Sequence, residues 1–169
     1  RLVGRGAEGR ITAAYFGEGT QTLDFRTFQE HAAPDTTSDL LFKGALDGAS
    51  RSVYSGLITV RPEAVRTRAH QTNRNVKLSA EAWAESVPNL EIETNDVVCS
   101  HASAVSPVDE EQRFYLEARG VPTPVAERLI VEGFFDEVVA AAPVAALGEA
   151  LRCSLAERLD RRTDRAQAA

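Results

Sequence analysis

The sequence predicts a mainly β fold, a β-solenoid or β-helix in residues 1–105, followed by an α-helical segment in residues 106–169. Two observations support this division. Up to about Ala104, short runs of β-favouring residues alternate with turn residues, as in ITAAYF, TLDFRTFQ and SVYSGLITV. From Ser106 onward, the apolar residues recur at helical spacing. The chain therefore combines a β core with a helical appendage.

A weak internal repeat favours a solenoid for the β half. The segments ITVRPEAV (58–65), VKLSAEAW (76–83) and LEIETNDV (90–97) each place a polar corner after an alternating strand, with offsets of 18 and 14 residues. A β-sandwich also fits short alternating strands. The corners RPEA, SAEA and ETND favour the solenoid, in which the Asn and Gln side chains of QTNRN (71–75) point inward and stack from coil to coil.

Three helices are expected in the second half. Ser106 is predicted to cap the first helix with Pro107 at its first position, and Gly120 ends it. The second begins at Thr123 and Pro124, and we expect its apolar stripe to comprise Val125, Leu129, Ile130, Phe134 and Val138. The third begins near Pro143, with a stripe of Leu147, Leu151, Leu155 and Leu159.

Composition excludes several classes of protein. The chain has 19 Lys and Arg against 25 Asp and Glu, a net charge of −6, which argues against nucleic-acid binding. No apolar run reaches the roughly 18 residues of a membrane span, and no signal peptide is recognised. Two cysteines far apart in sequence fit a reducing, cytoplasmic setting. The opening RLVGRGAEGR and the absence of methionine indicate an N-terminally truncated β core.

Most isolated motifs favour structural roles. Gly4, Gly6 and Gly9 have the spacing of a dinucleotide fingerprint, but a strand-like run follows them instead of a helix, so we assign them to turns. His31 and His70 have no companion at metal-ligand spacing, and we expect hydrogen-bonded structural roles for both.

Cys99 and His101 are the strongest candidate pair. In an extended strand they project from the same face. A closed zinc site needs four ligands, so a metal bound here takes its other ligands from a carboxylate or a second chain. A nucleophile–base pair needs a third orienting group, which the spacing does not supply. Structural packing remains an equal alternative, and Cys153 is expected to be a helix-face residue.

Long motifs then match a known family. The segments SGLITV, QTNRNVKLS, PNLEI, DVVCSH and FYLEARG occur in order, and the match runs from about Tyr15 to about Val139. The chain resembles the C-terminal part of the SufB/SufD family of iron–sulfur cluster assembly proteins. Its Cys-Ser-His run is similar to the SufD type.

The resemblance implies a right-handed parallel β-helix followed by an α-helical segment. It further implies a non-enzymatic scaffold of the SUF system, which pairs with a SufB-like subunit and binds a SufC-like ABC-type ATPase. No P-loop occurs in this chain, so ATP hydrolysis belongs to that partner. No cofactor is permanently bound, and a transient iron–sulfur cluster forms at the partner interface.

The resemblance also assigns residues. Cys99 and His101 match positions at the SufB–SufD interface, where His101 is the metal ligand and a partner cysteine supplies the missing thiolate. Phe114, Tyr115, Arg119 and Gly120 match the ATPase-contact region.

One departure from the family and two rival functions complete the expectations. The family pattern G-A-T-x-G after Cys-Ser-His is replaced by residues 102–106, ASAVS, whose lack of glycine restricts the backbone at the strand-to-helix junction. A β-solenoid enzyme acting on polysaccharides would use carboxylates such as Glu91, Glu93 and Asp96. A structural homodimer without a cluster role is the other rival, because an exposed strand edge favours self-pairing.

Overall fold

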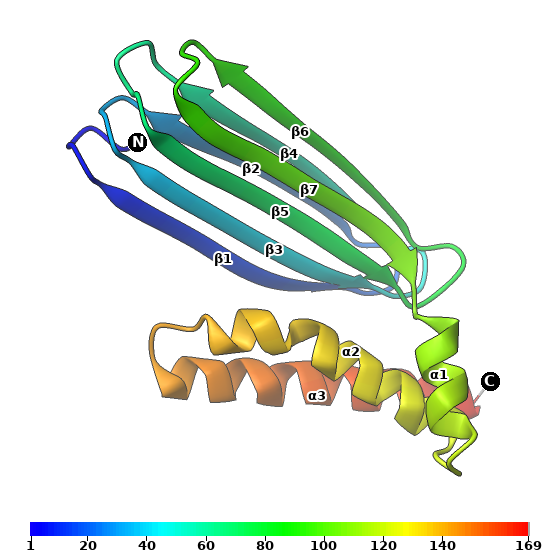
Figure 1. The fold of residues 1–169 in the computed structure, drawn as a ribbon. Helices are drawn as coiled ribbons and strands as arrows, with labels where there is room; N and C mark the ends of the chain where they lie inside the picture. Colours follow the sequence, from blue (N-terminus) through cyan, green and yellow to red (C-terminus); the bar gives the residue numbers. More distant parts are fainter. Residues whose placement is uncertain (169) are drawn as a thin grey trace.

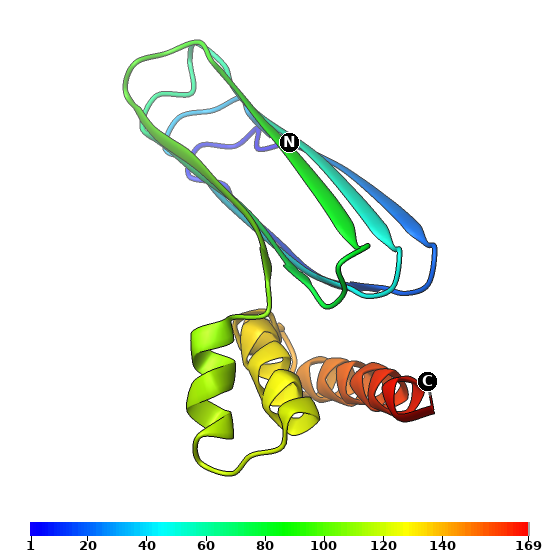
Figure 2. The ribbon, with the colours of Figure 1, turned by 90° about the vertical axis from the view of Figure 1, so that its right-hand side faces the viewer.

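The computed structural model describes residues 1–168 and contains two parallel sheets and a helical segment. Strands β1, β3, β5 and β7 form one sheet in that order, and β2, β4 and β6 form the other. The two sheets face each other, and the helices lie along one side of the four-stranded sheet (Figures 1 and 2). The elements are β1 (Glu8–Gly17), β2 (Thr22–His31), β3 (Thr37–Leu46), β4 (Arg51–Val60), β5 (Thr67–Lys77), β6 (Trp83–Ile92), β7 (Val97–Pro107), α1 (Glu110–Glu117), α2 (Thr123–Ala140) and α3 (Ala145–Ala168).

The fold is a β-solenoid of about three coils, as the sequence predicted. Each coil contributes one strand to each sheet, so equivalent positions recur about every 30 residues. The repeat proposed from the sequence was partly wrong. Segments 58–65 and 90–97 occupy equivalent positions, because Ile58 of β4 pairs with Leu90 of β6. Segment 76–83 instead begins at the end of β5, in the four-stranded sheet, and forms the corner that leads to β6.

The solenoid interior combines a column of aromatic side chains, in tilted and edge-on contact, with buried amides. Tyr15, Phe25, Phe42 and Tyr54 follow one another with ring centroids 4.5 to 5.7 Å apart. From the QTNRN segment, Gln71, Asn73 and Asn75 are buried, which confirms that these side chains point inward. They do not form a coil-to-coil ladder of like residues.

Tyr15 reaches across an entire coil to the buried amides. Its hydroxyl donates a 2.6 Å hydrogen bond to Asn75 Oδ1, and Asn75 Nδ2 donates to Asn73 Oδ1 at 3.1 Å. Gly44 lies between Tyr15 and Asn75 in the sheet register. The missing side chain of Gly44 therefore makes room for the tyrosine ring.

His31 is a structural core residue, in agreement with the sequence-based expectation. It is fully buried, with Nδ1 2.7 Å from Thr36 Oγ1 and Nε2 2.8 Å from Ser38 Oγ. Gln29 Nε2 donates to the same Ser38 oxygen, which leaves the Ser38 hydroxyl proton available for His31 Nε2. This arrangement favours a neutral imidazole, and burial lowers the pKa of His31 below its ordinary value of 6.5.

Acidification is therefore expected to destabilise the solenoid through His31. The folded protein resists protonating this imidazole, whereas the unfolded chain accepts the proton near the ordinary pKa. Its contribution to stability is complete above that pKa and is lost as the pH falls toward the lower folded-state pKa. The melting temperature should fall between about pH 7.5 and pH 5, and less steeply in His31→Gln. Equal slopes in the two proteins would contradict this assignment.

The helical segment begins later than the sequence suggested. β7 continues through Ser106 to Pro107, and Asp109 caps α1 by accepting hydrogen bonds from the backbone N–H groups of Glu111 and Gln112. The predicted Ser106 cap is therefore wrong, because that residue still pairs with Val76 in the sheet. The second helix does begin at Thr123.

The buried face of α2 also differs from the predicted stripe. Val138 is buried as predicted, and Ile130 and Phe134 pack on the core. Val131 and Phe135 are buried although they were not in the stripe, whereas Val125 and Leu129 are exposed. Along α3, Leu155 and Leu159 are buried and Leu147 is exposed. Together with apolar residues at the strand ends, these helices form one core cluster: Phe16, Ala45, Val76, Leu78, Val108, Val131, Phe135, Leu155 and Leu159.

Two buried or half-buried cations fasten the helices to the solenoid. Lys43 of β3 donates to the Phe134 carbonyl at 2.9 Å and pairs with Glu137 at 2.7 Å. Arg162 of α3 pairs with Asp47 at 3.2 Å and donates to the Leu78 carbonyl at 3.0 Å. Within residues 1–168, no helix is both long and apolar enough to span a membrane.

Candidate functional site

The solenoid ends in two strands that pair on one side only. β7 is the last strand of the four-stranded sheet and β6 the last of the three-stranded sheet. We call these two strands and the corner between them, residues 83–107, the open end. Their outer edges present unpaired backbone groups, which is the usual template for strand addition. Both strands lie together at one end of the solenoid (Figure 1).

Cys99 and His101 share one face of β7, as the alternation predicted, and that face points inward. Cys99 pairs with Ala69 of β5 and His101 with Gln71, both of which are buried inward residues. Because no further coil covers β7, His101 is exposed and Cys99 is half-buried. The pair is therefore presented to whatever docks on the open end.

The two side chains differ in chemistry. Cys99 packs against a small apolar cluster that contains Ile58, Val60 and Ala69, and burial raises the pKa of its thiol. The thiol is thus mainly protonated near neutral pH and is a weak nucleophile by itself. Among the described residues, no group of three His, Cys, Asp or Glu side chains is arranged to hold a metal ion.

Gln71, next to His101 in the neighbouring strand, is a buried amide without hydrogen-bond partners among the described residues. It is buried beside His101 in the sheet register, yet neither its Oε1 nor its Nε2 has a hydrogen-bond partner in the described part of the chain. A buried amide without partners is uncommon in native proteins. The sequence placed this residue inside the solenoid but gave no sign that its amide is unpaired.

On the outward face of β7 the polar side chain of Ser100 is hydrogen-bonded, and the strand keeps a regular register. Ser100 Oγ lies 2.6 Å from His70 Nδ1, which gives His70 the hydrogen-bonded surface role that we expected. Residues 102–106, which replace the glycine-containing family pattern, continue the strand in regular register with β5. The chain at the site is therefore extended up to the helical junction.

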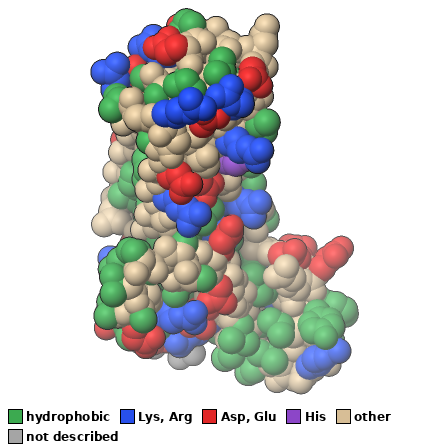
Figure 3. Space-filling model, turned by 60° about the vertical axis from the view of Figure 1, so that its left-hand side comes forward, with side chains coloured by type: hydrophobic (Ala, Val, Ile, Leu, Met, Phe, Trp, Pro, Cys, Tyr) green, Lys and Arg blue, Asp and Glu red, His purple; other side chains and the backbone are tan. Residues whose placement is uncertain are grey.

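A second candidate surface lies on α1 and α2. Phe114 and Tyr115 are 70% and 57% exposed, and Leu129 is 47% exposed. Apolar side chains gather over this part of the helical segment (lower right of Figure 3). We call this surface, with Val125, Ile130 and Phe134, the helical face. It was not predicted for α2, because the sequence assigned these positions to the core.

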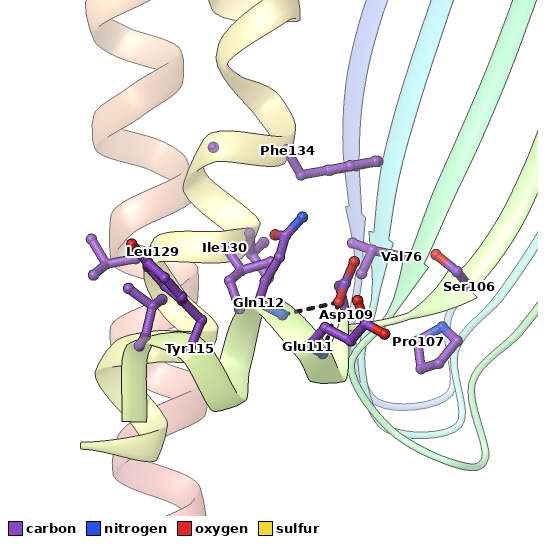
Figure 4. A pocket seen from close by; sticks show the side chains of 13 residues that line it. Val76, Ser106, Pro107, Asp109, Glu111, Gln112, Tyr115, Leu129, Ile130 and Phe134 are labelled. Atoms are coloured by element: carbon purple, nitrogen blue, oxygen red, sulfur yellow. Dashed lines mark hydrogen bonds between the residues drawn. The ribbon is translucent and has the colours of Figure 1, made fainter. Parts of the chain in front are cut away.

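A cavity of about 760 Å³ extends the helical face toward the solenoid. Tyr115, Leu129 and Phe134 line its helical side, and Val76 and Pro107 line the side formed by the ends of β5 and β7 (Figure 4). The helices and the strand that carries Cys99 and His101 therefore line the same cavity.

The other two predicted contact residues, Arg119 and Gly120, follow α1 in the chain. The guanidinium carbon of Arg119 stacks 3.7 Å above the centre of the Tyr115 ring. Gly120 adopts a left-handed conformation with φ of 83°, directly after the last turn of α1. Nothing in the described structure tests whether these residues contact another protein, so that assignment stays a prediction.

The acidic residues of the rival hydrolase hypothesis lie at the corner after β6. Glu91 accepts a hydrogen bond from Thr59 at 3.4 Å, and Glu93 lies 3.7 Å from Arg61. Asp96 lies directly before β7. The carboxylates of Glu91 and Glu93 thus contact the neighbouring coil.

Comparison with known proteins shows the family to which this chain belongs. A family model described as "SUF system FeS cluster assembly, SufBD core domain" matches residues 1–134. The chain belongs to this family. Because the match covers the complete solenoid, the fold and the resemblance support each other.

Relatives extend the match into the helical segment. An iron–sulfur cluster assembly SufBD family protein of Mycobacterium bovis is 40% identical over 95% of this chain and 42% of its own length. The SufD proteins of Escherichia coli and Bacillus subtilis are 31% and 33% identical over 94% and 85% of this chain. They are covered over 38% and 33% of their own lengths. The chain thus spans less than half of each of these relatives.

Proposed function

We propose that this protein is a scaffold subunit of the SUF system that pairs with a SufB-like subunit and a SufC-like ATPase in the cytoplasm. The observation that carries the proposal is the open end, where Cys99 and His101 lie on the uncovered inward face of a strand with an unpaired edge. Membership of the SufBD family supplies the chemistry that such a surface would serve.

The open end would form half of a shared assembly site. Cys99 and His101 are too few to hold an iron–sulfur cluster, which usually takes four protein ligands. A SufB-like strand added to β7 would bring further ligands to the same layer. The growing cluster is the cargo of this site, and the polar amide of Gln71 lies beside it.

The helical face would receive the ATPase. Its exposed aromatic and leucine side chains resemble the centre of a protein–protein interface, where Tyr and Phe are enriched. The cavity beneath it is lined by both helices and strand ends, so a partner pressing on α1 and α2 would also press on the end of β7. The nucleotide chemistry itself would reside in the partner, and this subunit would not be an enzyme.

Disrupting the helical face should release the ATPase alone. In the full-length protein, Leu129→Asp places a charge in the middle of this exposed apolar surface and should weaken ATPase binding by about tenfold or more. Leu147→Asp is the matched control, since Leu147 is an equally exposed leucine on α3 outside the cavity. Co-purification of both partners measures the effect. Equal ATPase loss in the two variants would contradict the assignment.

Removing the His101 imidazole should impair cluster assembly without dissolving the complex. In complexes purified with the partners, we expect His101→Ala to lower the rate of cluster formation by at least about tenfold. Ser103→Ala, at the next inward position of the same exposed strand, is the control and should remain near wild type. Absorption spectroscopy during reconstitution provides the rates. An unchanged rate in His101→Ala would remove His101 from the site.

A further inference from the structure

The open end carries only negative formal charge. Between Lys77 and Arg113 the chain has eight acidic residues and no lysine or arginine. This interval contains the open end, with Glu85, Glu91, Glu93 and Asp96, and the residues on either side of it up to the beginning of α1. All eight carboxylate residues are exposed: Glu81, Glu85, Glu91, Glu93, Asp96, Asp109, Glu110 and Glu111.

The earlier coils have the opposite balance. Residues 1–77 contain eleven Lys and Arg against eight Asp and Glu. The acidic character is therefore a property of the last coil and not of the solenoid as a whole.

Rows of ion pairs along the corners alternate arginine with acidic residues, and on the last coil they end, among the described residues, without a further arginine. Along one corner, Glu30 lies between two arginines, with Arg1 Nε at 3.1 Å and Arg61 Nε also at 3.1 Å. Arg61 then continues to Glu93 of the last coil at 3.7 Å. The charge thus alternates from coil to coil, and the row stops at an acid.

A second row at the neighbouring corner follows the same pattern. Asp35 lies between Arg5, at 2.9 Å, and Arg66, at 2.6 Å. Asp35 and Arg66 both have positive φ and occupy equivalent corner positions. The backbone N–H of Arg66 donates to the Asp96 carbonyl, and Asp96 ends the row on the last coil. In these rows, Glu30 and Asp35 each have an arginine on both sides, whereas Glu93 has one on a single side and Asp96 is joined to Arg66 through its backbone carbonyl.

We propose that the open end selects a partner edge that carries arginine or lysine and discriminates against a second copy of this chain. This inference rests on the proposed function, and the occupant is the SufB-like subunit. A basic edge continues the alternation of both rows. A second copy instead brings the same four carboxylates of its own open end against the first four, and like charges facing each other across strands are unfavourable. The charge therefore works against the homodimer that a bare strand edge favours.

The test compares two neutralised variants of the full-length protein with equal net charge. The open-end variant is Glu85→Gln, Glu91→Gln, Glu93→Gln and Asp96→Asn. The control variant is Glu8→Gln, Asp24→Asn, Asp39→Asn and Glu63→Gln, all exposed positions outside the open end. Association with the purified SufB-like subunit is measured by stopped-flow or surface binding at about 50 and about 300 mM salt.

The wild type and the control should associate about tenfold more slowly at the higher salt, and the open-end variant should lose most of that dependence. The same salt dependence in all three proteins would overturn the proposal. Self-association by analytical ultracentrifugation is the second arm. The open-end variant should self-associate more strongly than the wild type and the control.

The two arms separate this inference from the function on which it rests. If the wild type binds no SufB-like subunit at either salt, the proposed function fails. Self-association still decides the charge claim in that case. Equal self-association of the open-end variant, the control and the wild type would refute it.

Discussion

Phe135→Ala is expected to lower the free energy of unfolding of the helix–solenoid contact by about 3–5 kcal/mol. Phe135 is fully buried in the cluster that joins α2 and α3 to the strand ends, and its ring packs against Phe134 with centroids 5.1 Å apart. Truncation leaves a cavity at the centre of that contact. Denaturant unfolding followed by circular dichroism, together with limited proteolysis of α2, measures the loss.

Val125→Ala is the matched control for this substitution. Val125 lies on the same helix but is 45% exposed on the helical face, so its truncation should change stability by less than about 0.5 kcal/mol. If both variants lost the same stability, the structure's division of α2 into a buried and an exposed side would be wrong.

Gly44→Ala is expected to destabilise the solenoid core by about 2–4 kcal/mol. A Cβ at this position would overlap the Tyr15 ring and lie 2.6 Å from Asn75 Oδ1. Tyr15 would have to move away, which breaks its hydrogen bond to Asn75 and leaves a buried amide oxygen without that donor. Thermal and denaturant unfolding both report this change.

Gly133→Ala provides the opposite expectation from the same chemical change. Gly133 lies inside α2, and a Cβ there meets no atom within 4 Å. Since alanine is the better helix former, this variant should gain about 0.5–1 kcal/mol. A Gly44→Ala protein as stable as Gly133→Ala would show that Tyr15 does not occupy the space above Gly44.

The solenoid could be predicted from strand alternation, but the assignment of each strand to one of the two sheets could not. Ile58 and Leu90 were placed in equivalent positions, because each begins a similar strand-and-corner segment. Val76 was stacked with them although it belongs to the other sheet. A period of two residues tells which side chains share a face, and it carries no information about which of two sheets a strand joins.

The part of the candidate site that depends only on strand geometry could be predicted from the sequence. The i and i+2 spacing was sufficient to place Cys99 and His101 on one face of a strand. That this face lies uncovered at the end of the solenoid depends on the complete topology.

The α2 part of the helical face was missed because α2 is apolar on more than one side. Helical periodicity picked Val125 and Leu129, whereas Val131 and Phe135 are the residues that pack on the solenoid. Both sets recur at helical spacing, so only the tertiary contact separates them. The attachment through Lys43 had no sequence signal, since a lysine in a strand normally faces solvent.

The most direct measurement of the proposed scaffold role is the composition of the complex that the full-length protein forms. It is co-expressed with a SufB-like subunit and a SufC-like ATPase, purified through a tag on this protein, and analysed by native mass spectrometry. We expect one copy of this protein together with the SufB-like subunit and bound ATPase. Recovery of this protein alone, or only as copies of itself, would contradict the scaffold role.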